Sequence, residues 1–187
     1  MPHRFEPATS GRAKCRGCGG VLARGEWRFG ECLPNPFADG DLMYWFHPPC
    51  AAFKRPEALL EALLEGLAAA QPEVPERAEL ERLARAASAH RRLARIDGAE
   101  RAPSAKARCR ACKAPIERGT WRIRLVFHDE GRFSPGGFLH LACREAYFEC
   151  APESEALRGP VLRFSARLEP GERAELEREL ATRPPPA

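Results

Sequence analysis

The sequence has few lysines, few aromatic residues and no long apolar stretch. Only four of its 30 basic residues are lysine, and this preference for arginine, with abundant Ala, Glu and Pro, indicates a GC-rich bacterial genome. No apolar run approaches the roughly 20 residues that a membrane-spanning helix needs. The N-terminal sequence MPHRFEPATSGRAK has no apolar signal core. We therefore expect a cytoplasmic protein without a membrane partner, in which paired cysteines hold metal rather than form disulfides.

Motifs typical of enzymes are missing as well. The chain has no phosphate-cradling glycine loop with its lysine, no pair of acids, and no nucleophile beside a base outside its cysteine motifs. We therefore expect no catalytic activity.

What the sequence does contain is an internal repeat. The segment CRGCGGVLARGEWRFG at 15–30 returns, with changes, as CRACKAPIERGTWRIR at 109–124. Further along, HPPC at 47–50 matches HLAC at 140–143. Landmarks that recur in the same order at nearly the same spacing indicate a tandem duplication.

Each repeat contains the pattern C-x2-C, a long gap, and H-x2-C. The gap is 28 residues in the first repeat and 27 in the second. Three thiolates and one imidazole complete the tetrahedron that zinc prefers, without redox chemistry. A redox pair is the alternative for a lone CxxC, but two matched copies favour zinc. We expect two zinc ions per chain, bound by Cys15, Cys18, His47 and Cys50 and by Cys109, Cys112, His140 and Cys143.

Two cysteines, Cys32 and Cys150, have no counterpart in the other repeat. We expect them to be buried, inert thiols, because free cysteine behaves as a small hydrophobic residue. The alternative is that Cys150 substitutes for a ligand or acts as a redox-sensitive thiol.

The expected fold class is α+β, with two small zinc-clasped domains that each combine a short antiparallel sheet with helices. We place the domains at 1–97 and 104–187, joined by a small, polar, Pro-containing linker at 98–103. Alternating apolar residues predict strands at 26–32 and 120–127, followed by Pro- and Gly-rich loops at 33–42 and 128–137. Helical periodicity predicts helices at 56–67, 75–96 and 171–180.

Basic residues gather at the two CxxC segments. Residues 10–28 contain five Lys or Arg and one Glu, and residues 104–124 contain seven and one. The rest of the chain is net negative, because the whole chain carries only +4. Charge concentrated at the same place in both repeats favours a phosphate-binding surface over a merely solvated one. Lys14 and Arg108 belong to this predicted DNA-binding set.

These motifs resemble the zinc finger of the poly(ADP-ribose) polymerase (PARP) type, which also occurs at the front of one eukaryotic DNA ligase. The segments that carry the resemblance are SGRAKCRGC, GEWRFG and FADGDLMYWFHPPC in the first repeat and SAKARCRAC, GTWRIR and FLHLAC in the second. The resemblance implies two tandem fingers, without the polymerase's catalytic domain, that recognise DNA strand breaks by structure and not by sequence.

The resemblance also implies roles for single residues. By position, Arg28 and Arg122 are the arginines that grip phosphates, and Arg12 and Lys106 make a second backbone contact. Apolar loop residues of such fingers cap the base pair exposed at a break. The residues in the corresponding places are Phe37 and Leu42 in the first repeat and Phe133 in the second, whose loop departs from the pattern.

The predicted function is therefore zinc-dependent binding of DNA ends, nicks and gaps by a monomeric, nucleoid-associated protein with a role in DNA damage and repair. The main alternative is a zinc-stabilised adaptor that binds a repair or regulatory protein through its Leu-rich helices. A thiol enzyme or redox sensor is the other alternative, and the metal content separates it from the first two.

Overall fold

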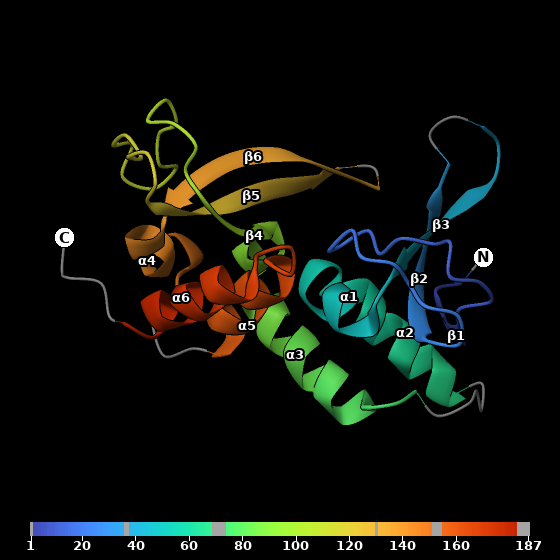
Figure 1. Ribbon diagram of the computed structural model, residues 1–187. Coiled ribbons are helices and arrows are strands. Elements are labelled where there is room, and N and C mark those ends of the chain that lie inside the picture. Colours follow the sequence, from blue (N-terminus) through green and yellow to red (C-terminus); the bar gives the residue numbers. More distant parts are fainter. Residues whose placement is uncertain (1, 36–37, 69–73, 130, 151–154, 183–187) are drawn as a thin grey trace. The chain divides into compact units, whose positions relative to one another are not determined.

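The computed structural model describes residues 2–35, 38–68, 74–129, 131–150 and 155–182. The chain divides into two compact units, 1–94 and 95–187 (Figure 1). Within the described residues, every helix is too short or too polar to cross a membrane.

The first unit is built on an antiparallel sheet in the order β1-β2-β3. Its strands are β1 (Arg4–Pro7), β2 (Trp27–Pro34) and β3 (Asp41–Phe46). The elements that follow are α1 (Pro48–Lys54), α2 (Pro56–Ala68), α3 (Arg77–Ala89) and the 3-10 helix η1 (Arg91–Arg95). Helices α1 and α2 pack against the sheet, and α3 packs against both helices. Phe29, Phe46 and Leu59 are fully buried where sheet and helices meet, so this contact forms the core.

The second unit repeats the sheet in the order β4-β5-β6. Its strands are β4 (Ile96–Arg101), β5 (Trp121–Asp129) and β6 (Arg132–His140). The elements that follow are η2 (Leu141–Cys143), α4 (Arg144–Phe148), α5 (Glu155–Phe164) and α6 (Pro170–Ala181). Helix α5 packs against β4. Two antiparallel sheets with helices confirm the predicted α+β class.

Residues 98–103, expected to be a linker, instead contribute to β4, the edge strand of the second sheet. The small residues that look like a linker are required by close packing. Gly98 has φ +90°, and a Cβ there would lie 2.3 Å from the Phe164 carbonyl oxygen. Ala99 and Ala102 are also buried, so this segment is part of the core of the second unit.

Residues 128–137, expected to be a loop, largely extend the β5–β6 hairpin. A register shift between Leu125 and Val126 marks a bulge, and Gly137 opposite has φ +99°. Pro135 is tolerated because β6 is an edge strand and needs fewer ladder donors. Turn-forming residues therefore mark an irregular strand pair here, not a loop.

The predicted helices at 56–67 and 171–180 correspond to α2 and α6. The predicted helix at 75–96 is too long: α3 ends at Ala89, and the chain then passes through η1 into β4. Helices α1, α4 and α5 have no counterpart among the predicted elements.

Candidate metal centres and nucleic-acid interface

The structure brings the predicted zinc ligands together in two clusters. Within each cluster the ligand atoms all lie within 4.8 Å of one another. The members are Cys15, Cys18, His47 and Cys50 in the first unit and Cys109, Cys112, His140 and Cys143 in the second. In each unit the sheet supplies the scaffold, because the CxxC turn precedes the central strand and the His lies at the end of the last strand. His47 comes directly after β3, and His140 is the final residue of β6.

The distances within the clusters fit zinc. Tetrahedral zinc with bonds of about 2.3 Å to sulfur and about 2.0 Å to nitrogen separates a sulfur from a nitrogen by about 3.5 Å. The His47 Nδ1 lies 3.4 Å from Cys18 Sγ and 3.9 Å from Cys50 Sγ. The His140 Nδ1 lies 3.4 Å from Cys112 Sγ and 3.8 Å from Cys143 Sγ. Two Cys3His clusters are therefore compatible with two zinc ions per chain.

Each ligand histidine is oriented by the turn that holds the first two cysteines. In both clusters Nδ1 faces the sulfurs. The opposite nitrogen, Nε2, lies 3.2 Å from the Val21 carbonyl oxygen in the first unit and 2.9 Å from the Pro115 carbonyl oxygen in the second. An Nε2–H that donates to this carbonyl fixes the tautomer in which Nδ1 is free to bind metal.

Backbone amides surround the sulfurs. The amide of His47 donates to Cys15 Sγ at 3.3 Å, and the amide of His140 donates to Cys109 Sγ at 3.4 Å. The Gly20 amide donates to Cys18 Sγ at 3.4 Å, and a Cβ on Gly20 would crowd that sulfur at 3.3 Å. These bonds stabilise thiolates, the form that zinc requires.

The ligand groups perturb one another's acidity. A hydrogen bond from Cys15 holds the pKa of Cys18 far below its usual value, and hydrogen bonds from the same thiols raise the pKa of His47 to about 10. In the second unit, burial opposes ionisation of Cys109, but backbone donors led by His140 lower its pKa to about 7. One thiolate in each cluster is therefore accessible near neutral pH. The neighbouring thiols and burial raise the pKa of Cys50, and burial and the neighbouring thiols raise the pKa of Cys143, so zinc must displace their protons.

The two unmatched cysteines lie outside both clusters. Cys150 is buried as expected, and burial raises the pKa of its thiol; that it is inert stays a prediction. Cys32, expected to be buried, is instead half-buried on β2, and its backbone amide donates to His3 Nδ1 at 3.1 Å.

Basic residues surround each CxxC turn at equivalent positions. We call these residues the basic collar: Arg12, Lys14, Arg16 and Arg24 in the first unit and Lys106, Arg108, Arg110 and Arg118 in the second. All are exposed. In each collar, a backbone hydrogen bond joins the segment before the CxxC turn to the segment after it. The Leu22 amide donates to the Ala13 carbonyl oxygen, and the Ile116 amide donates to the Ala107 carbonyl oxygen. Four of the eight collar residues were not among the predicted DNA contacts, although the repeat pairs Arg16 with Arg110 and Arg24 with Arg118.

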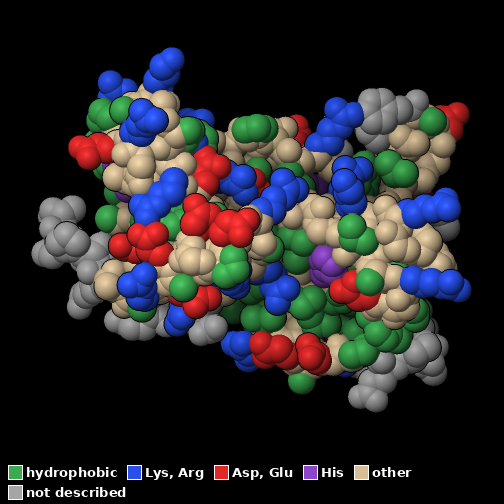
Figure 2. Space-filling model, viewed as in Figure 1, with side chains coloured by type: hydrophobic (Ala, Val, Ile, Leu, Met, Phe, Trp, Pro, Cys, Tyr) green, Lys and Arg blue, Asp and Glu red, His purple; other side chains and the backbone are tan. Residues whose placement is uncertain are grey.

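The two collars differ in how their side chains are used. In the second unit, Arg108 donates to the Lys113 carbonyl oxygen at 3.2 Å, and Arg110 donates to the Gly136 carbonyl oxygen at 3.0 Å. In the first unit, Arg16 lies over the Tyr44 ring at 4.8 Å. On the face shown in Figure 2, acidic side chains stand between the basic ones, so the repeated positions define the collar better than overall charge does.

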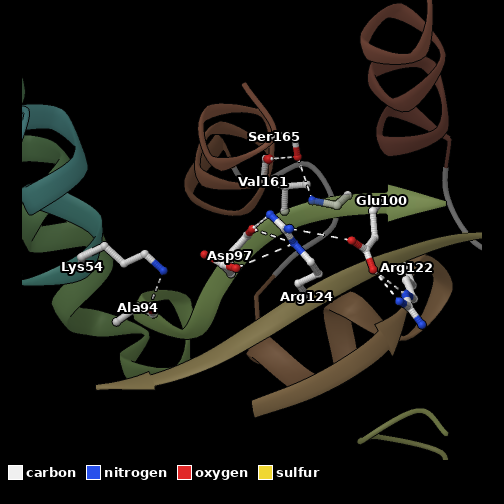
Figure 3. A network of polar contacts seen from close by, with 9 residues as sticks. Lys54, Ala94, Asp97, Glu100, Arg122, Arg124, Val161 and Ser165 are labelled. Atoms are coloured by element: carbon white, nitrogen blue, oxygen red, sulfur yellow. Dashed lines mark hydrogen bonds and ion pairs between the residues drawn. The ribbon is translucent and has the colours of Figure 1, made fainter. Parts of the chain in front are cut away.

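The predicted phosphate-gripping arginines are buried. Arg28 is 7% exposed and Arg122 is 6% exposed. Arg28 donates to Glu6, and Arg122 donates to Glu100. Figure 3 shows Glu100 on β4 reaching Arg122 on β5. Their role in binding DNA stays a prediction, but most of each guanidinium is enclosed by the protein.

Two of the predicted capping residues lie in the described part of the chain. Leu42 on β3 is 37% exposed. Phe133 is half-buried against His128, with ring centroids 4.9 Å apart. Phe37 lies outside the described residues. Sequence reasoning missed Phe127, which is 40% exposed and has Arg95 over its ring at 4.8 Å.

Comparison with known proteins agrees with this zinc architecture. No protein-family model matches the chain. It is 28% identical over 141 residues to poly(ADP-ribose) polymerase 1 of Gallus gallus and 29% identical over 158 residues to the poly(ADP-ribose) polymerase of Drosophila melanogaster. It is 26% identical over 141 residues to poly(ADP-ribose) polymerase 1 of Oryza sativa subsp. japonica.

These matches cover 69%, 76% and 74% of this chain but only 14%, 16% and 14% of the respective relatives. The chain therefore spans a small part of the length of these polymerases. Together, the similarity and the two Cys3His clusters confirm the predicted resemblance to two tandem PARP-type zinc fingers.

Proposed function

We propose that the protein binds DNA at strand breaks through the basic collars of its two zinc-clasped units, without reading sequence and without catalysis. The observation that carries this proposal is the recurrence of four exposed basic residues at equivalent positions around each CxxC turn. Neither zinc binding nor packing requires exposed charge there. A phosphate backbone does, because each neutralised phosphate releases counterions and strengthens association.

The zinc-bound knuckle gives the collar residues a rigid backbone from which to contact DNA. Backbone bonds such as Gly19 to Cys15 and Cys15 to Gly20 close the first knuckle tightly, so the collar side chains project from a fixed frame. A fixed frame lowers the entropic cost of placing several charges along one backbone. The contacts predicted in this way are sequence-independent.

Preference for a break needs an apolar contact as well. In an intact duplex the faces of base pairs are covered, whereas a break exposes one face. Leu42 and the predicted residues Phe37 and Phe133 are the candidates to cover it, and Phe127 extends this set in the second unit. Capping tolerates any base, because every base pair has an apolar face.

The test is a binding panel on the zinc-loaded protein with nicked, gapped, blunt-ended and overhanging duplexes and a covalently closed circle. We expect tighter binding to every broken duplex than to the closed circle. Equal affinity for broken and closed DNA would refute break recognition, and no binding at physiological salt would favour the adaptor alternative.

Charge variants locate the site. Replacing Arg12, Lys14 and Arg24 by Gln should lower the slope of log K against log salt by about three, because about one counterion is released per phosphate contact. Replacing the exposed Arg82 and Arg85 on α3 and Arg91 on η1 by Gln removes three charges elsewhere in the same unit and is the matched control. A slope that changes equally in both variants would show that the collar is not the site.

A further inference from the structure

Each unit places a glutamate directly opposite an arginine on the neighbouring strand. Glu6 on β1 pairs in register with Arg28 on β2, and Glu100 on β4 pairs in register with Arg122 on β5. We propose that Glu6 and Glu100 are positioning residues that hold these arginines ready for a DNA phosphate. The inference rests on the proposed function, since it concerns two arginines outside the basic collar that are predicted to contact the same DNA.

The geometry immobilises both guanidinium groups. Arg28 forms an ion pair with Glu6, and its guanidinium carbon lies 3.6 Å from the centroid of the Trp45 ring. Arg122 donates to Glu100 through both Nε, at 2.9 Å, and NH2. Its guanidinium carbon lies 3.6 Å from the centroid of the Phe138 ring. A carboxylate at one edge and an aromatic face beneath leave the group little freedom.

One nitrogen of each guanidinium, NH1, forms no hydrogen bond within the described part of the protein. Among the described residues, the carboxylates engage Nε and NH2 of Arg122 and NH2 of Arg28, and no hydrogen bond engages NH1 of either arginine. In the described part of the chain, Nε of Arg28 is fully buried and has no hydrogen-bond partner. NH1 of Arg28 and NH1 of Arg122 also have no partner, but they are not fully buried. Each NH1 can therefore donate to a phosphate oxygen without breaking the ion pair.

Stability alone is a weak reason to keep this arrangement. Buried ion pairs contribute little compared with apolar residues of similar size, because desolvation offsets their attraction. Yet both units keep Glu and Arg at these positions, while Phe5 is replaced by Ala99 and Trp45 by Phe138. Both units therefore hold an arginine in a fixed orientation. A planar guanidinium in a fixed orientation can direct its N–H donors at a phosphate.

The second unit adds a further support. Arg124 also approaches Glu100, at 3.7 Å, and donates to the Asp97 carbonyl oxygen at 2.6 Å (Figure 3). Glu100 thus stands between two arginines and is held in place from both sides. Both arginines belong to the neighbouring strand β5, so the Glu100 carboxylate is held from that strand and stays in position when a phosphate arrives.

The experiment compares Glu6→Gln and Glu100→Gln with the parent for binding to a nicked duplex. Removing an acidic residue from a DNA-binding protein normally strengthens binding, because it removes repulsion. Loss of positioning should instead weaken the binding of DNA. We expect each variant to bind the nicked duplex about tenfold more weakly than the parent, as for the loss of one charge-assisted hydrogen bond. Unchanged or tighter binding by both variants would overturn the proposal.

Matched controls are Glu65→Gln in the first unit and Glu117→Gln in the second, both at exposed glutamates. We expect these to bind as the parent does or slightly more tightly. Zinc content and the thermal midpoint are measured for every variant, and if Glu6→Gln loses its metal, Glu100→Gln provides the same test in the other unit.

A double-mutant cycle separates positioning from general destabilisation. If Glu6 acts through Arg28, then Glu6→Gln has no further effect on DNA affinity in an Arg28→Gln background. Additive losses would overturn the positioning role. A parent protein that does not distinguish nicked from closed DNA would instead refute the proposed function, so the two failures are distinguishable.

Discussion

Lys113 and Gly19 occupy the same position in the two zinc knuckles and share a left-handed backbone, with φ of 65° and 72°. A residue with a Cβ is strained there, by about 1–2 kcal/mol. We predict that Lys113→Gly stabilises the zinc-loaded second unit by about 1 kcal/mol. Thermal or denaturant unfolding of the zinc-loaded protein measures the change. Lys113→Ala, which removes the charge but keeps the strain, should not be stabilised, and equal gains in both variants would contradict the strain argument.

The close approach at Gly98 gives a second prediction. Gly98→Ala introduces both backbone strain and a clash with the Phe164 carbonyl, so the free energy of unfolding should fall by about 3 kcal/mol or more. Gly119 is the control, because its φ is +81° but nothing lies within 4 Å of an added Cβ. Gly119→Ala should cost about 1 kcal/mol, for strain alone. Similar losses at both glycines would argue against the packing of β4 on α5.

Loss of one zinc ligand should affect one ion. Cys18→Ser is expected to lower the metal content from about two zinc ions per chain to about one, with loss of structure in the first unit because zinc binding is coupled to folding. Elemental analysis and circular dichroism test both statements. Cys32→Ser should retain both ions, since Cys32 lies outside the clusters. Unchanged zinc content in Cys18→Ser would show that the cluster is not a zinc site.

Leu42 offers a test of capping that leaves charge untouched. We predict that Leu42→Ala reduces the preference for nicked over closed duplex by about tenfold, near the lower end of the range for stacking contacts, while the salt dependence stays the same. Val21→Ala is the control, because Val21 is 55% exposed but lies in the CxxC turn. The measurement is the ratio of the two dissociation constants. If both variants keep the parent's ratio, Leu42 does not cap the break.

The zinc ligands could be read from the sequence because spacing alone defines them. Eight ligands in two matched patterns leave few other pairings, and the structure brings all eight together. The edge strands could not be read in the same way. Strand β1 has only four residues and β4 has six, with too little apolar alternation to stand out. The available signal was Glu6 and Glu100, which each precede the first ligand cysteine by nine residues.

The burial of Arg28 was not predicted because strand β1 was not predicted. An arginine next to Trp27 on a strand looks solvent-facing unless its partner strand is known. In the folded sheet, Glu6 on β1 lies opposite Arg28, and their attraction offsets the free-energy cost of removing the arginine from water. Phe127 was missed for a different reason: the bulge at Leu125 and Val126 reverses the alternation, so the next large residue faces outward. Local irregularities of this kind depend on tertiary pairing and leave no trace in periodicity.

The position of β4 also decides how the protein can be dissected. A fragment that starts at residue 104 would begin after the edge strand, so it would lack Glu100 and expose the hydrogen-bonding edge of β5 to other chains. Separating the fingers between residues 94 and 95 keeps that strand with its own sheet. Isolated fingers prepared for spectroscopy should therefore be cut before Ile96, and aggregation of shorter fragments would report a missing strand and not a missing metal.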